Sequence, residues 1–160
     1  MSQLPSQPCA ESGRDGDVLR SCSGDASRPP RRRLVSDASI AVIEDDDVLC
    51  SSLVDLMRSM NHRAEPFASA EMLLASPDLS RFDCVVADVH LSGMNGLDLV
   101  RRLRERGEET PVILITALTD KRLDDEAVGV GAVCLLRKPF EAGTLLDWIE
   151  RSLPGEHPQR

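Results

Sequence analysis

The sequence predicts a doubly wound α/β fold, in which helices cover both faces of a five-stranded parallel sheet. From residue 39 onward, short and nearly continuous apolar runs alternate with longer amphipathic stretches. Strands buried on both faces are typical of parallel sheets, and their alternation with helices predicts βαβ units. With 160 residues and 41% hydrophobic content, the chain is long enough for one domain with a buried core.

Five apolar runs are expected to form the strands. They are residues 39–43, 63–67, 84–88, 111–115 and 133–136. The second run is the weakest strand, and it leads into a short helix expected over 69–76, which Pro77 ends. Each strand is thus followed by a segment that can cross over to the next.

Apolar side chains at helical spacing define the inner faces of the longer helices. A helix over 47–60 should bury Leu49, Leu53, Leu56, Met57 and Met60. The helix after the third strand should bury Leu97, Val100 and Leu103, with Arg101, Arg102, Arg104 and Glu105 outside. The last helix, 141–153, should bury Leu145, Ile149 and Leu153. Between the fourth and fifth strands only Leu123, Ala127 and Val130 form a stripe, which predicts a short and loosely held helix.

The predicted domain occupies residues 38–153. Residues 1–37 are rich in Ser, Arg, Asp, Gly and Pro without apolar periodicity, and we expect a disordered tail. Its basic segment 28–33 is either part of a solvated linker or a contact for an acidic surface. Residues 154–160 are expected to form a short C-terminal tail.

Composition restricts the function. A net charge of -8 disfavours a nucleic-acid surface. No apolar run approaches the roughly 18–20 residues that span a bilayer, and the N-terminus lacks the pattern of a secretory signal, so a cytoplasmic protein is expected. The five cysteines are odd in number and form no C-x-x-C pair, which indicates buried thiols rather than a zinc site or a disulfide framework.

Polar side chains gather where the predicted strands end. Acids 44–47 follow the first strand, Asp88 ends the third, Thr116 follows the fourth and Lys138 follows the fifth. Ligands of doubly wound sheets bind outside the carboxyl ends of the strands. These groups should therefore meet at one edge of the sheet.

The chemistry of this edge suits a transferring phosphoryl group. Crowded carboxylates require a cation, and oxygen ligands suit Mg²⁺. A lysine and a hydroxyl add contacts for phosphoryl oxygens, and a free carboxylate can act as the nucleophile. The alternative is that the acids only cap the next helix, which is favoured for Asp46 and Asp47 and remains equally open for Glu44 and Asp45.

Four segments resemble the receiver domain of two-component response regulators. They are VIEDDD (42–47), DCVVADVHLSGMNGLDLVRRLR (83–104), PVILITA (111–117) and GAVCLLRKPF (131–140). With their spacing they cover about 38–153, which implies the flavodoxin-like receiver fold. The segments most resemble receivers that elsewhere precede a helix-turn-helix output domain. Because the sequence ends at Arg160, a stand-alone receiver is expected here.

The resemblance implies specific roles. Asp88 would be the phosphoacceptor, and Thr116 and Lys138 would contact the phosphoryl group. Glu44, Asp45, Asp88 and the backbone carbonyl of His90 would hold Mg²⁺. The phosphoryl donor would be a sensor histidine kinase or a histidine phosphotransfer protein. The protein would act as a switch and not as an enzyme with other substrates. It would bind a downstream protein through residues 118–130 and the last helix.

Departures from the family pattern leave alternatives open. Leu135 stands where an aromatic residue often reports phosphorylation, and the chain has no tyrosine. Ser92 replaces a common proline and is expected to loosen its loop, while the His90 side chain either tunes hydrolysis or has no role. Two other classes compete with this interpretation: a receiver-like adaptor that is never phosphorylated, and a metal-dependent phosphatase. The phosphatase usually has D-x-D after its first strand, which this sequence lacks.

Overall fold

The structure is a computed structural model that describes residues 37–153. The tails expected over 1–37 and 154–160 lie outside the described residues, apart from Asp37. The elements in chain order are β1 (Ser39–Ile43), α1 (Asp47–Ser59), β2 (Arg63–Phe67), α2 (Ala70–Leu74), β3 (Cys84–Asp88), α3 (Gly96–Glu105), β4 (Val112–Thr116), α4 (Arg122–Val130), β5 (Cys134–Arg137) and α5 (Ala142–Ser152). The predicted five strands and five helices are confirmed.

The sheet is parallel throughout, in the order β2-β1-β3-β4-β5. The chain first builds outward from β1 to β2 and then returns to the other side of β1. Ile43 pairs with Ala87 across β1 and β3, and Asp88 pairs with Ile115 across β3 and β4. The carboxyl ends of these strands therefore coincide, and the residue that follows Ile43 lies beside Asp88.

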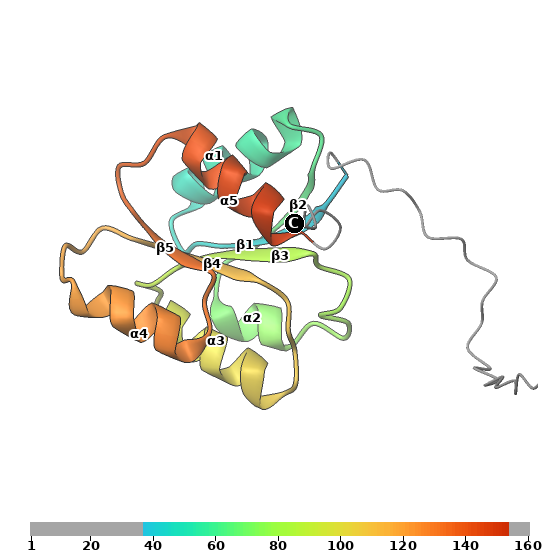
Figure 1. Cartoon of the computed structure of the whole chain (residues 1–160). Helices are drawn as coiled ribbons and strands as arrows, with labels where there is room; N and C mark the ends of the chain where they lie inside the picture. The colour runs from blue at the N-terminus through green and yellow to red at the C-terminus, as the bar shows by residue number, and fades with distance from the viewer. Residues whose placement is uncertain (1–36, 154–160) are drawn as a thin grey trace, which may run out of the picture. The chain divides into compact units, whose positions relative to one another are not determined.

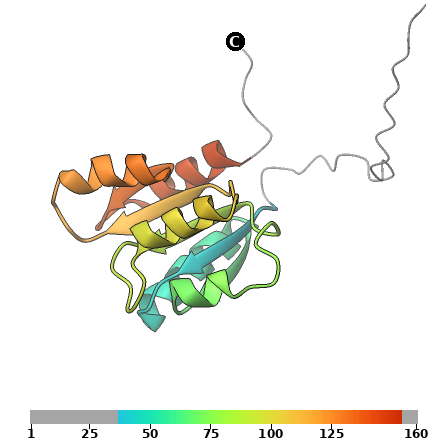
Figure 2. The same ribbon diagram turned by 90° about the horizontal axis from the view of Figure 1, so that it is seen from below.

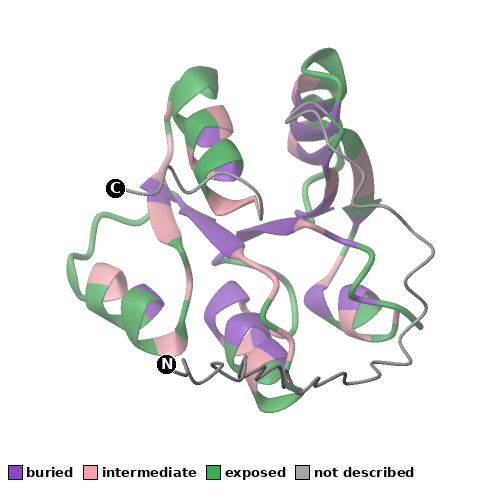
Figure 3. Ribbon diagram, turned by 45° about the vertical axis from the view of Figure 1, so that its right-hand side comes forward, coloured by how far each residue is buried: buried purple, intermediate pink, exposed green. Residues whose placement is uncertain are grey.

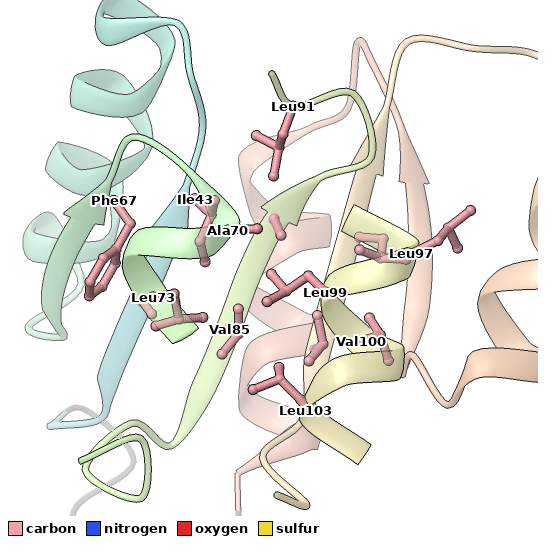
Figure 4. Close-up of a cluster of buried hydrophobic side chains, with 14 of the residues drawn as sticks. Ile43, Phe67, Ala70, Leu73, Val85, Leu91, Leu97, Leu99, Val100 and Leu103 are labelled. Carbon is pink, nitrogen blue, oxygen red and sulfur yellow. The ribbon is translucent and has the colours of Figure 1, made fainter. Parts of the chain in front are cut away.

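Two layers of helices cover the sheet. Figure 1 shows α1 and α5 on one face and α2, α3 and α4 on the other, and Figure 2 views the second layer from its outer side. The strands β1, β3 and β4 are buried, whereas the outward sides of the helices are exposed (Figure 3). Figure 4 shows the core beneath α2 and α3, where Leu73, Val85 and Leu99 pack between the helices and the sheet.

The buried face of α1 agrees only partly with the predicted one. The buried side chains are Cys50, Leu53, Val54 and Met57. The prediction was wrong for Met60, which is 42% exposed because α1 ends at Ser59 and the chain turns at Asn61, where φ is 64°. Leu49 and Leu56, also expected to be buried, are half-buried at the margin of this face.

Two predictions at helix ends also need correction. Arg104 was expected outside α3, but its guanidinium group donates to the carbonyls of Glu108 (2.7 Å), Thr110 (3.1 Å) and Gly131 (3.0 Å). It therefore joins the end of α3 to the segments before β4 and β5. In α5, Leu145 and Ile149 are buried as predicted, whereas Leu153 lies at the cap and is only half-buried.

Helix α4 is regular but sparsely packed. Ala127 is its single fully buried residue, and Leu123 and Val130 pack partly against the core. Arg137 at the end of β5 holds the helix through a bidentate pair with the Asp124 carboxylate (2.8 and 3.0 Å). The weak apolar stripe seen in the sequence thus corresponds to a helix that has one fully buried residue and a polar contact to β5.

No helix within residues 37–153 is long and apolar enough to cross a membrane.

Candidate functional site

Three charged side chains from three strand ends meet at the carboxyl edge of the sheet. The Lys138 ammonium group contacts Asp88 Oδ2 and lies 3.3 Å from Glu44 Oε2. Glu44 and Asp88 are 4% and 6% exposed, so two carboxylates are buried beside one cation. Fully desolvated charges of this kind are stable only when they are paired.

The acids that follow β1 divide between the site and the helix. Both roles, capping the helix and contributing to the site, were open from the sequence. Asp46 is the N-cap of α1, and its Oδ1 accepts the N–H groups of Val48 and Leu49, both at 3.0 Å. Asp47 lies in the first helical turn, where a negative charge complements the helix dipole. Glu44 instead points into the site, and its Oε1 accepts the Asp46 N–H at 3.2 Å. Capping is thus confirmed for Asp46 and the first-turn position for Asp47.

Burial shifts the ionisation of the central groups. Desolvation raises the pKa of Glu44 to about 7, aided by the neighbouring charge of Asp88 and opposed by the Asp46 N–H and Lys138. Burial by itself lowers the pKa of Lys138, but the bonds and charges of Asp88 and Glu44 outweigh it and hold that pKa above its ordinary value. Lys138 therefore stays charged, while burial favours the protonated form of Glu44.

The loop after β3 is held by the carboxylates of the site. The His90 N–H donates to Asp88 Oδ1 at 2.6 Å. The Ser92 N–H and hydroxyl both donate to Asp45 Oδ2, at 3.1 and 2.9 Å. These bonds keep the pKa of Asp45 below its ordinary value. The backbone N–H of Ser92, which proline lacks, thus forms one of the bonds of this loop, while the looser loop expected from the missing proline stays a prediction.

The structure places Thr116 and His90 at the same edge without direct side-chain bonds to the central trio. Thr116 is fully buried at the end of β4, and its hydroxyl accepts the Leu118 N–H at 3.1 Å. Its backbone carbonyl accepts the Lys138 N–H at 2.8 Å, just before the cis Lys138-Pro139 bond. The His90 side chain is exposed. Thr116 therefore helps to fix the backbone that carries Lys138.

The donor set fits a magnesium ion. Mg²⁺ prefers hard oxygen ligands and keeps several waters while it binds one or two carboxylates. Glu44, Asp45, Asp88 and the His90 carbonyl are oxygen donors of this kind, and the two buried carboxylates share a single ammonium group. Within residues 37–153 no three His, Cys, Asp or Glu side chains form a ready cage. The predicted ligand set depends accordingly on a backbone carbonyl and on solvent.

Two supporting residues were not foreseen from the sequence. Glu71 on α2 accepts the Met94 N–H at 2.8 Å and so fixes the far end of the loop after β3. Arg137 precedes Lys138 and connects β5 to α4 through Asp124. An arginine beside a predicted site lysine was the only available signal, and Glu71 gave none beyond its place in the first turn of a helix.

Comparison with known proteins agrees with this geometry. The family model for the response regulator receiver domain matches residues 40–150. The response regulator protein TodT of Pseudomonas putida is 35% identical over 121 residues, covering 76% of this chain and 53% of TodT. The transcriptional regulatory protein FixJ of Bradyrhizobium diazoefficiens is 37% identical over 120 residues, covering 74% of this chain and 58% of FixJ. The chain therefore spans about half the length of these curated relatives.

Solved structures give the same result. A structure of the chemotaxis protein CheY4 of Vibrio cholerae has a TM-score of 0.67 and 27% identity, with 72% of this chain and 98% of that chain covered. A structure of the response regulator StyR has a TM-score of 0.68 and 32% identity, with 74% and 59% covered.

Fold and site together define a signalling domain of the doubly wound class, with an acidic site at the carboxyl edge of its sheet. The chain belongs to the response regulator receiver family. It is a receiver domain of the two-component type, the domain through which response regulators take part in phosphoacceptor signal transduction. Receivers are generally Mg²⁺-dependent switches that interact with sensor kinases and downstream partners.

Proposed function

We propose that Asp88 is the residue that accepts the phosphoryl group in this receiver. The observation that supports this most strongly is a buried carboxylate at the end of β3 in contact with the ammonium group of Lys138. Glu44 lies against the same ammonium group and completes an acidic edge. The proposed nucleophile, a cation and a second carboxylate thus lie at the carboxyl ends of three different strands.

The reaction is an in-line displacement on a phosphohistidine. One Asp88 carboxylate oxygen attacks the phosphorus atom, the P–N bond breaks, and its electron pair returns to the imidazole of the donor. A new P–O bond makes an acyl phosphate on Asp88. The donor would be a sensor histidine kinase or a histidine phosphotransfer protein. Such reactions depend mainly on positioning and on charge stabilisation.

Each neighbour of Asp88 has a distinct part. Lys138 stabilises negative charge on the transferring group, and the His90 N–H orients the Asp88 carboxylate through Oδ1. Glu44, Asp45, Asp88 and the His90 carbonyl would hold Mg²⁺, which supplies positive charge to the phosphoryl oxygens. The Thr116 hydroxyl, now bonded to the Leu118 N–H, would turn to a phosphoryl oxygen. Water later hydrolyses the acyl phosphate, which releases inorganic phosphate and restores the carboxylate.

The output would be a change of protein contacts. Movement of Thr116 would alter residues 118–130, which include the sparsely packed α4. A downstream protein would bind there and along α5. Because Leu135 replaces the usual aromatic residue, this coupling would not use an aromatic rotamer.

The test is phosphotransfer from a radiolabelled phosphohistidine donor in the presence of Mg²⁺. Wild type should take up the label and Asp88→Asn should not. Asp98→Asn, which alters an acid on the outer side of α3, is the matched control and should behave like wild type. Equal labelling of wild type and Asp88→Asn would overturn the proposal, and a folded wild type that takes no label would indicate the adaptor class. Steady turnover of an added phosphate ester would indicate a phosphatase.

A further inference from the structure

The loop between β3 and α3 is fastened by three carboxylates in turn. The alternate residues His90, Ser92 and Met94 donate their backbone N–H groups to Asp88 Oδ1 (2.6 Å), Asp45 Oδ2 (3.1 Å) and Glu71 Oε1 (2.8 Å). Two of these acceptors are proposed site residues, and the third belongs to α2. The position of the loop and the positions of the acidic side chains therefore depend on one another.

Asp45 is the acceptor that most needs such support. It is exposed, whereas Glu44 and Asp88 are buried and contact Lys138. An exposed carboxylate can adopt several rotamers, and each rotamer that turns away from the site lowers metal affinity. Ser92 restrains it through two bonds that reach across 47 positions of the sequence.

Both Ser92 donors bind the same oxygen, Oδ2. This arrangement holds one oxygen of the carboxylate and places no Ser92 donor on Oδ1. Groups that hydrogen-bond to a metal ligand commonly change metal affinity by 10- to 100-fold when they are removed. The hydroxyl is one of two donors here, so its loss should have a smaller effect.

Gly93 and Glu71 hold Ser92 in place. Gly93 has φ of +84°, a left-handed conformation that side chains disfavour. A Cβ atom at Gly93 would also lie 2.6 Å from Glu71 Oε1, the oxygen that accepts the Met94 N–H. The turn that presents Ser92 to Asp45 is thus held by the conformation of Gly93 and by the bond between Met94 and Glu71.

We infer that Ser92 is a positioning residue that orients Asp45 for Mg²⁺. This inference rests on the proposed function, since it assumes that Asp45 is a metal ligand. It concerns a position where this chain departs from the commoner proline, and it gives the serine hydroxyl a role that proline could not have.

The experiment compares Mg²⁺ affinity by titration calorimetry in wild type, Ser92→Ala and Ser92→Thr. Ser92→Ala keeps the backbone N–H and removes the hydroxyl, and its Kd should rise on the order of 3- to 10-fold. Ser92→Thr keeps both donors and should remain close to wild type. In an Asp45→Asn background, Ser92→Ala should add no further loss, because the pair acts together.

Ser80→Ala is the matched control. Ser80 also donates its N–H and its hydroxyl to a single carboxylate oxygen, Oδ1 of Asp78, at 3.1 and 2.5 Å. It is exposed like Ser92 but lies in the segment before β3. Its removal should leave Mg²⁺ affinity unchanged, and metal-free melting temperatures should show that all variants fold.

Equal Mg²⁺ affinities for Ser92→Ala and Ser80→Ala would overturn the inference, as would tighter binding by Ser92→Ala. Phosphorylation of wild type by a small-molecule acyl phosphate separates this result from the proposed function. If wild type takes the phosphoryl group on Asp88 and the two serine variants bind Mg²⁺ equally, only the role of Ser92 is lost. If wild type neither binds Mg²⁺ nor becomes phosphorylated, the proposed function fails as well.

Discussion

The Nζ atom of Lys138 lies 3.3 Å from Glu44 Oε2, although the two residues are 94 positions apart in the sequence. The same ammonium group contacts Asp88, so one cation serves two buried carboxylates. The stability of this edge of the sheet should therefore change when any of these three charges is removed.

Replacing Lys138 should destabilise the metal-free domain. Lys138→Met leaves Glu44 and Asp88 buried without a cation, which should lower the free energy of unfolding by about 1–3 kcal/mol. Urea denaturation with a chelator present measures this loss, and added Mg²⁺ should restore part of it. Lys121→Met, at an exposed position before α4, should have little effect. If both variants were equally stable, Lys138 would not compensate the buried acids.

Glu44 should make stability depend on pH. Its folded pKa of about 7 exceeds the ordinary value of 4.5, so the folded state binds the extra proton between these values. Its contribution to stability is fully present below about pH 4.5 and is lost as pH rises through 7. Relative to Glu44→Gln, metal-free wild type should lose up to about 3 kcal/mol of unfolding free energy from pH 5 to pH 8.

The control for this titration is Glu109→Gln, at an exposed position before β4. The difference in unfolding free energy between Glu109→Gln and wild type should stay constant over the same range. A pH-independent difference between wild type and Glu44→Gln would contradict the burial of an ionisable carboxyl group at this edge.

Gly96 should tolerate no side chain. A Cβ atom there would lie 2.5 Å from the Asp88 carbonyl oxygen and 3.0 Å from Val89 Cα. Gly96→Ala must therefore displace the backbone of Asp88, at a cost of about 1–3 kcal/mol in unfolding free energy. Phosphorylation of Asp88 should also slow.

Gly143→Ala is the matched helical control. A Cβ atom at Gly143 in α5 would meet nothing within 4 Å, so alanine should stabilise the protein by about 0.5–1 kcal/mol. Thermal unfolding of the two variants compares them directly. Opposite signs are expected, and equal stabilisation would show that α3 does not approach Asp88 so closely.

Arg137 should control the stability of α4. Arg137→Gln breaks the bidentate pair with Asp124 and the bond to the Asp120 carbonyl (2.9 Å). Ala127 is the only fully buried residue of α4. The amide hydrogens of α4 should therefore exchange faster in Arg137→Gln than in wild type. Arg122→Gln removes an arginine that bonds only Asp120 and should leave exchange in α4 nearly unchanged. Unchanged protection in Arg137→Gln would mean that apolar packing suffices.

The fold and the central site were predictable because they depend on local patterns. Apolar strands of four or five residues define a parallel sheet, and a parallel sheet brings its carboxyl ends to one edge. That rule predicts that Glu44, Asp88 and Lys138 lie close together. The family resemblance added the roles of these residues, which the spacing alone does not provide.

The remaining details depend on contacts that sequence spacing does not encode. The bond between Ser92 and Asp45 requires a particular loop conformation, so substitution of the common proline suggested a looser loop. The inner face of α1 was misplaced because apolar side chains surround more than half of that helix, and Met60 falls beyond its end. Arg104 looked like an ordinary outer residue, since its partners are backbone carbonyls on distant segments.

The most direct test of the account is chemical mapping of the phosphorylated residue. Wild type would be phosphorylated in the presence of Mg²⁺, reduced with borohydride and digested for mass spectrometry. Borohydride converts an aspartyl phosphate to homoserine, and we predict homoserine at position 88 in wild type and unmodified sequence in Asp88→Asn. Homoserine at position 45 or another acid, or its absence from a labelled wild type, would contradict the assignment of Asp88.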